Sequence, residues 1–152
     1  MEHLTKYLIT FCIVVIAGCS NETSPDKEGE PRAILIEGSG SYTREISTKV
    51  KNSQTFFDQG LRFAWGFYFP ESIASYQEAA RLDPSHPMPY WGMAHAMGPN
   101  PNSRYARMPD DPKGEGLKAI KMALEKIENA NSLEKRLIKA MHIFYDKKSI
   151  SD

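Results

Sequence analysis

Apolar residues recur at three- and four-residue spacing through most of the chain beyond residue 52, which is the pattern of helices with one buried face. Prolines and polar clusters divide this region into five segments. The segments are 53–68, 70–82, 88–97, 113–129 and 133–147. Ser53 is a residue type that caps helix N-termini, so we expect the first helix to begin there. The pattern therefore predicts an all-α domain of five helices.

The predicted helices form repeating pairs. The small residues Gly60 and Ala94 lie 34 residues apart, whereas Ile73 and Leu117, at a later position of the unit, lie 44 residues apart. This difference indicates an insertion within the second unit, at 98–112. A repeated helix pair predicts a solenoid, in which each unit buries its apolar face against the next. The predicted units are 53–86, 87–130 and a partial third unit at 131–147.

The first unit resembles a tetratricopeptide repeat (TPR) along its whole length. It has a small residue at Gly60 in the first helix, an aromatic residue at Tyr76 in the second, and a proline at Pro84 that closes the unit. Two residues depart from the family pattern: Gln59, where a large apolar residue is usual, and Ser72, where an alanine is usual. The resemblance implies a TPR-like solenoid of about 2.5 helix pairs.

A closer resemblance is to a group of exported bacterial TPR proteins. It implies no particular activity. Members of the group have further repeats, so we expect either a shortened chain or a last helix, 133–147, that acts as the solvent-facing cap of a solenoid. A polar tail follows at 148–152. Four short stretches carry the resemblance: 57–61, 80–84, 90–92 and 98–100.

The N-terminus has the layout of a signal peptide, over residues 1–18. Lys6 precedes an apolar run over 7–18, which has the length of a signal core and is too short to span a bilayer. The run ends in Ala17 and Gly18 directly before Cys19, which resembles the lipobox of bacterial lipoproteins. That resemblance implies cleavage before Cys19 and lipidation of its thiol. The alternatives are an ordinary secretory signal with an incidental cysteine and a cytosolic chain whose first helix is buried.

Lipidation would hold the chain at a membrane of the bacterial cell envelope, and Ser20 at the next position favours the outer membrane. The stretch 19–52 would then be a tether. Its polar part, 20–33, cannot bury apolar area, so we expect disorder there. Beyond it we expect an extended arm in which 34–36 pairs with 42–50 as a weak hairpin.

Composition argues against several classes of function. The 152 residues include 19 basic and 19 acidic side chains, so the chain lacks the basic surface typical of nucleic-acid binding. Hydrophobic residues make up 41% and charged residues 25%, as in an ordinary globular domain. No two histidines have i,i+4 spacing, and neither a phosphate-binding glycine loop nor a Gly-x-Ser-x-Gly motif occurs. We therefore assign no catalytic residue, metal site or cofactor.

Partner-binding residues are expected on the first helix of each pair. In TPR proteins these helices line a concave groove. The resemblance places eight residues of this chain in it, namely Gln54, Phe57, Leu61, Ala64, Trp65, Met88, Trp91 and His95, and we take five of them as candidates for partner binding. If exposed, the tryptophan rings would make an apolar, ring-lined groove suited to a peptide or to the face of a sugar. Core packing explains aromatic residues at helical spacing equally well. The five residues are Phe57, Leu61, Trp65, Trp91 and His95.

The 98–112 insertion is a second candidate surface. Its fifteen residues are many for a connection between two helices. It contains Arg104, Tyr105 and Arg107, and arginine and tyrosine are enriched where proteins bind one another. Because loops lie at the surface, we expect these three side chains to be accessible to a partner. A packed structural loop is the alternative.

Three functions are open at this point. The leading one is a membrane-anchored TPR module that binds another protein of the cell envelope. The second is a solute- or glycan-binding lipoprotein in which Trp65 and Trp91 are stacking platforms. The third is an enzyme subunit whose catalytic domain lies beyond residue 152. Exposure of the two tryptophan rings separates the first two, because only an exposed ring can stack on a sugar.

Overall fold

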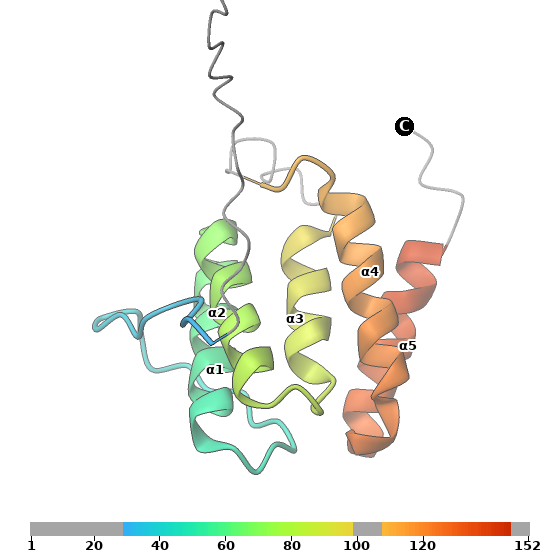
Figure 1. Ribbon diagram of the computed structural model, residues 1–152, viewed down its shortest axis with the longest axis horizontal. Helices are drawn as coiled ribbons and strands as arrows, with labels where there is room; N and C mark the ends of the chain where they lie inside the picture. The colour runs from blue at the N-terminus through green and yellow to red at the C-terminus, as the bar shows by residue number, and fades with distance from the viewer. Residues whose placement is uncertain (1–28, 99–107, 147–152) are drawn as a thin grey trace, which may run out of the picture. The chain divides into compact units, whose positions relative to one another are not determined.

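The computed structural model describes residues 29–98 and 108–146 (Figure 1). Over these residues the chain forms five α-helices and one short 3-10 helix, with no strand. The expected all-α class is therefore confirmed, and the helix predicted at 88–97 has the observed bounds. The elements are α1 (Lys51–Trp65), α2 (Phe69–Leu82), α3 (Met88–Met97), α4 (Pro112–Glu125), η2 (Ile127–Asn129) and α5 (Ser132–Asp146).

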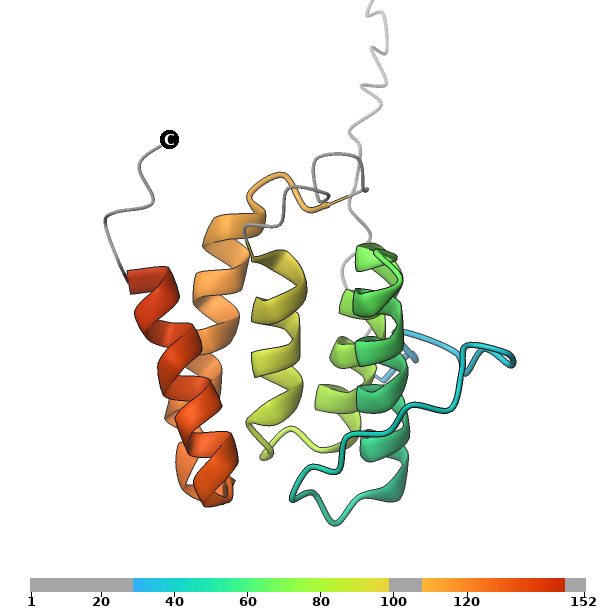
Figure 2. The ribbon, with the colours of Figure 1, turned by 180° about the vertical axis from the view of Figure 1, so that it is seen from behind.

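The helices pack in chain order. Neighbouring helices lie side by side from α1 to α5, and the contacts between α1 and α2 and between α3 and α4 are the most extensive (Figures 1 and 2). The odd-numbered helices also touch, because α3 contacts both α1 and α5. In the part of the chain that the structure describes, no helix is long and apolar enough to cross a membrane.

The first helix does not begin at a serine cap, so that prediction is wrong. Helix α1 begins at Lys51, and Ser53 lies inside it with none of its surface exposed. The Ser53 hydroxyl donates a hydrogen bond of 2.9 Å to the main-chain carbonyl of Ala79 in α2. A buried hydroxyl needs a partner, and this one finds it on the neighbouring helix instead of on its own first turn.

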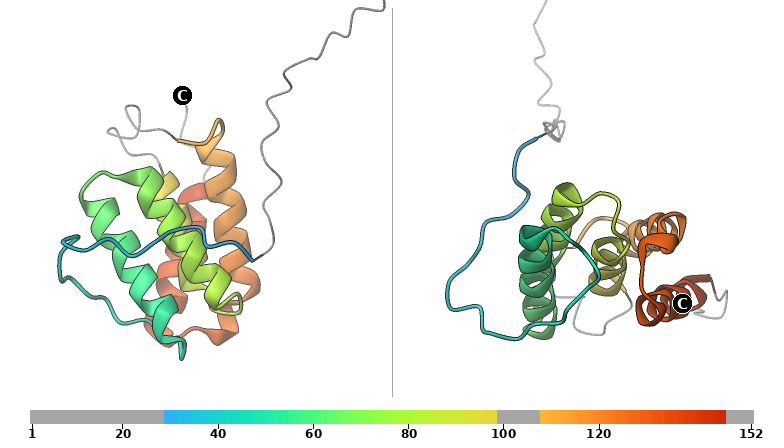
Figure 3. Two further views of the ribbon diagram at one scale, coloured as in Figure 1. Left: turned by 60° about the vertical axis from the view of Figure 1, so that its left-hand side comes forward. Right: turned by 90° about the horizontal axis from the view of Figure 1, so that it is seen from below.

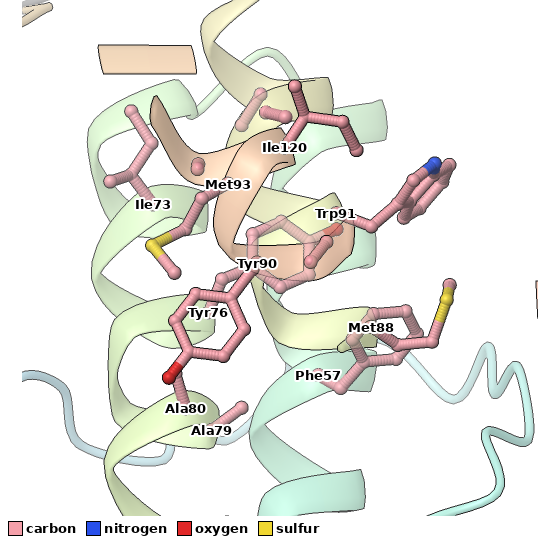
Figure 4. Packing of buried hydrophobic residues seen from close by; sticks show 14 of the residues in the cluster. Phe57, Ile73, Tyr76, Ala79, Ala80, Met88, Tyr90, Trp91, Met93 and Ile120 are labelled. Carbon is pink, nitrogen blue, oxygen red and sulfur yellow. The ribbon is translucent and has the colours of Figure 1, made fainter. Parts of the chain in front are cut away.

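A tyrosine between two glycines fixes the spacing of the first three helices. The ring of Tyr76 in α2 is fully buried, and a Cβ atom placed on Gly60 of α1 would lie 2.7 Å from its Cε1 atom. A Cβ atom on Gly92 of α3 would also meet this ring. The Phe57 ring packs against Tyr76 with centroids 5.5 Å apart (Figure 4). Two positions without side chains therefore allow three helices to close around one ring.

The arm before α1 lies on the helices and does not form the expected hairpin. Residues 31–50 cross α1 and α2 as an irregular extended segment (Figure 3). The buried carboxamide of Gln59 donates to the carbonyl of Ile34 (2.9 Å) and accepts from the N–H of Ile36 (2.8 Å). Gln59, one of the two departures from the TPR pattern, thus holds the first limb of the arm.

A second glutamine of α1 holds the returning part of the arm in the same way. Gln54 donates to the carbonyl of Arg44 and accepts from the N–H of Ile46, both at 2.9 Å. The N–H of Arg44 donates to Asp58 at 2.9 Å. Because helix side chains satisfy these main-chain groups, the two limbs of the arm have no need to pair with each other.

Candidate functional site

Two rings of α3 are stacked on each other at i,i+4 spacing. Trp91 and His95 have ring centroids 5.3 Å apart and an interplanar angle of 12°. Only 8% of Trp91 is exposed, and its indole points away from Tyr76 (Figure 4). Helix α3 ends at Met97, so this pair lies in its last two turns.

Helix α5 completes a pocket over this stack. Trp91, His95 and the end of α3 form one wall of a pocket of about 380 Å³. That volume lies within the range of small-ligand sites and suits one or two apolar side chains of a partner. The residues from α5 are Leu137, Ala140, Met141 and Phe144.

Hydrogen bonds at both ends of α5 fix the position of this helix. The Tyr145 hydroxyl donates to the carbonyl of Ala94 on α3 at 2.6 Å. At the other end of α5, the Asn131 side chain accepts from the N–H of Glu134 (3.0 Å), and the Glu134 carboxylate accepts from the N–H of Asn131 (2.8 Å). This reciprocal pair is a capping box, which fixes the start of the helix.

The pocket contains two buried polar atoms without partners. The indole nitrogen of Trp91 and Nδ1 of His95 make no hydrogen bond within the described part of the chain. Burial lowers the pKa of His95, so its imidazole is neutral at pH 7. A buried donor without a partner costs free energy, about 1–3 kcal/mol. Because this N–H is buried, a ligand could offer it a carbonyl oxygen only after side chains of the lining move, and it would then recover part of that cost.

The structure separates the residues that the sequence places in one groove. Phe57 is fully buried and Leu61 is 4% exposed, so both belong to the core and neither reaches the pocket. Trp91 and His95 do lie together in the pocket. Trp65 lies elsewhere, at the end of α1, and 70% of its surface is exposed.

The remaining candidates lie outside the described residues. This applies to Arg104, Tyr105 and Arg107 of the insertion, and also to Cys19. No group of three or more metal-ligating side chains occurs within the ranges that the structure describes.

Sequence reasoning did not assign the α5 side of the pocket. Leu137, Ala140, Met141 and Phe144 were expected only as the apolar face of a helix. The spacing of these residues is the sequence feature that could have identified them, since it places them on one side of α5. The pattern of one helix cannot show which neighbouring ring that side meets.

A serine, a histidine and a glutamate also meet where the arm reaches α5. Ser47 Oγ lies 3.0 Å from His86 Nε2 and donates to Glu134 at 2.5 Å. The N–H of Met88 donates to His86 Nδ1 at 3.3 Å, so the neutral ring carries its proton on Nε2 and donates toward Ser47. In this arrangement His86 does not accept the serine proton, as a base activating a nucleophile would. The cluster instead joins the arm to α5.

Comparisons with protein families, with curated proteins and with solved structures gave no match for this chain.

Proposed function

We propose that this chain is a membrane-anchored, TPR-like module that binds another protein of the bacterial cell envelope. The order of contacts supports the repeat: α1 packs on α2, α3 on α4, and the first helices of successive pairs touch each other. Tyr76 and Gly60, which carry the TPR resemblance in sequence, pack against each other in the core. Helix pairs that stack in this way expose an extended face suited to protein binding.

The main support for protein binding is the pocket between α3 and α5, which Trp91 and His95 of α3 and the apolar side of α5 line; we call it the α3–α5 pocket. It lies between two helices that the repeat makes equivalent, and it combines an apolar lining with the unpartnered N–H of Trp91. An extended peptide would insert one apolar side chain between Trp91 and Met141. One of its main-chain carbonyls would accept from the indole N–H.

Anchoring through Cys19 is part of the same proposal. A diacylglycerol on the thiol and a further acyl chain on the new amine would give stable membrane association, because two chains suffice for it. Binding would then occur at the membrane surface, where tethering raises the effective concentration of the module near other envelope proteins.

A peptide selection tests the binding function. Peptides selected from a displayed random library on the full chain should bind the wild type and lose affinity when Ala140→Phe fills the pocket. Trp91→Phe, which keeps an aromatic ring but removes the N–H, should weaken the same peptides by about tenfold. Trp65→Phe is the matched control and should leave their affinity unchanged. Peptides that bind all four proteins equally would refute the pocket as the binding site.

A solute- or glycan-binding lipoprotein is the second candidate. One observation favours it: the Trp65 ring is largely exposed, as a stacking platform must be. The nearly buried Trp91 does not meet this requirement.

A further inference from the structure

A second pocket lies at the end of α1, away from the stack of Trp91 and His95. The side chains of Tyr42, from the arm, and Trp65, the last residue of α1, are 54% and 70% exposed. Together with Arg62 and the 39–41 turn they line a pocket of about 440 Å³. Large apolar side chains that are exposed side by side often mark a binding surface.

The turn of the arm brings these groups together. Gly38 and Gly40 have φ angles of 76° and 100°, in the left-handed region that glycine adopts without strain. They reverse the arm so that Tyr42 returns over α1. There Arg62 Nη1 donates to the main-chain carbonyl of Tyr42 at 2.9 Å. One hydrogen bond thus fixes both the guanidinium and the aromatic residue of the arm.

The Arg62 guanidinium retains unused hydrogen-bonding capacity. Its Nε atom has no hydrogen-bond partner in the described part of the chain but is buried, so a ligand in the pocket would meet the terminal nitrogens of the guanidinium instead. Asp58, one turn earlier on α1, accepts hydrogen bonds from the Arg44 N–H and from Gln54, and it interacts with the Arg62 guanidinium through charge without a hydrogen bond. A guanidinium offers five N–H donors in a fixed plane, and a carboxylate is the group that matches two of them at once.

We propose that the pocket formed by Tyr42, Arg62 and Trp65 binds an acidic sugar, that is, a saccharide unit that bears a carboxylate. The aromatic rings offer faces for the apolar C–H face of the sugar ring, and the guanidinium offers donors for the carboxylate. The hydroxyls of Ser39 and Ser41 line the same pocket and suit the sugar hydroxyls. A peptide C-terminus would also satisfy Arg62, but it lacks the hydroxyls that two serines would pair with. This site is independent of the α3–α5 pocket.

The two tryptophans of the chain allow a direct test. In the full chain with Trp91→Phe, Trp65 is the only fluorophore of its kind. Titration with trigalacturonate should shift its emission to shorter wavelength, because stacking removes the ring from water. Galactotriose, which has the same size but no carboxylate, should bind about tenfold more weakly or not at all.

Variants identify the groups that bind. Arg62→Lys should weaken trigalacturonate by about tenfold because a lysine cannot make the paired contact. Arg136→Lys, at an exposed position of α5, is the matched control and should have no effect. Since Arg62 also holds the arm, Tyr42→Leu gives a second measurement that leaves the guanidinium in place, and it should weaken binding as well.

Three results would overturn the proposal. One is an unchanged Trp65 emission with trigalacturonate. Another is equal affinity for the neutral and the acidic sugar. The third is a response only to the peptide acetyl-Ala-Phe with a free C-terminus, which would assign the pocket to protein termini. None of these results bears on peptide binding at Trp91, so the two proposals fail separately.

Discussion

Replacing Gly60 by alanine tests the closest helix contact of the core. The added Cβ atom would lie 2.7 Å from Cε1 of Tyr76, whereas ordinary contacts begin at 3.4 Å, so the ring or the helix must move by about 0.7 Å (3.4 − 2.7). The same ring is confined on its other side by Gly92, so it has little room to retreat. Overpacking of this kind costs about 1–3 kcal/mol.

Helix propensity opposes this cost. Alanine is favoured over glycine inside a helix by about 1 kcal/mol, so the expected net loss in the free energy of unfolding is about 1 kcal/mol, within a range of zero to 2. Chemical denaturation followed by circular dichroism at 222 nm measures this free energy. An unchanged slope of the unfolding free energy against denaturant concentration would show that the variant still unfolds in two states.

A double-mutant cycle separates the two effects. In a Tyr76→Leu background the ring is absent, and Gly60→Ala should then stabilise the protein by up to about 1 kcal/mol because only the propensity gain remains. The sign of the glycine substitution should therefore reverse between the two backgrounds. Equal effects of Gly60→Ala in both backgrounds would show that the ring does not limit the approach of α1, and the reasoning about the three-helix contact would fail.

Three other perturbations have definite expected results. Burial lowers the pKa of His95 below its ordinary value, so the unfolded chain binds more protons on acidification. Stability contributed by this group is present above about pH 6.5 and is lost as the pH falls through the lowered pKa. His95→Phe should therefore reduce the decline in unfolding free energy below about pH 6.5, and the part that remains includes His86, whose pKa burial also lowers. Gln59→Leu leaves the Ile36 N–H without its partner, and we expect a loss of about 1–3 kcal/mol with faster amide hydrogen exchange at that residue. Cys19→Ala should release the protein from membranes on fractionation, and mass spectrometry of the wild type should show an acylated cysteine at the mature N-terminus; an unmodified thiol there would contradict lipidation.

Hydrophobic spacing predicts the helices well because a helix with one buried face needs apolar residues at fixed intervals. The bounds of α3 follow from its prolines and from Gly98, which are local signals. The start of α1 does not follow, because Ser53 bonds to Ala79, a residue 26 positions away. When a polar side chain forms its hydrogen bond with a residue far away in the sequence, the local sequence pattern does not reveal it.

The arm shows the same limit more strongly. Its first apolar run is exposed, with Ile34 74% accessible, so burial of side chains does not hold it. Two glutamine carboxamides hold it through main-chain atoms, and neither the hydrophobic pattern nor the TPR resemblance marks Gln54 or Gln59 for that role. The sequence likewise could not distinguish the exposed Trp65 from the buried Trp91, since this depends on which helix covers each ring.

Peptide binding at the α3–α5 pocket is tested most directly by the two indole N–H signals in a ¹H–¹⁵N correlation spectrum of the full chain. Trp65→Phe and Trp91→Phe assign the signals, because the chain has only two tryptophans. When a peptide from the displayed library is added, we expect the Trp91 signal to move while the Trp65 signal stays in place, since only the α3–α5 pocket binds the peptide. Movement of the Trp65 signal alone, or of neither signal at saturating peptide, would contradict peptide binding at this pocket.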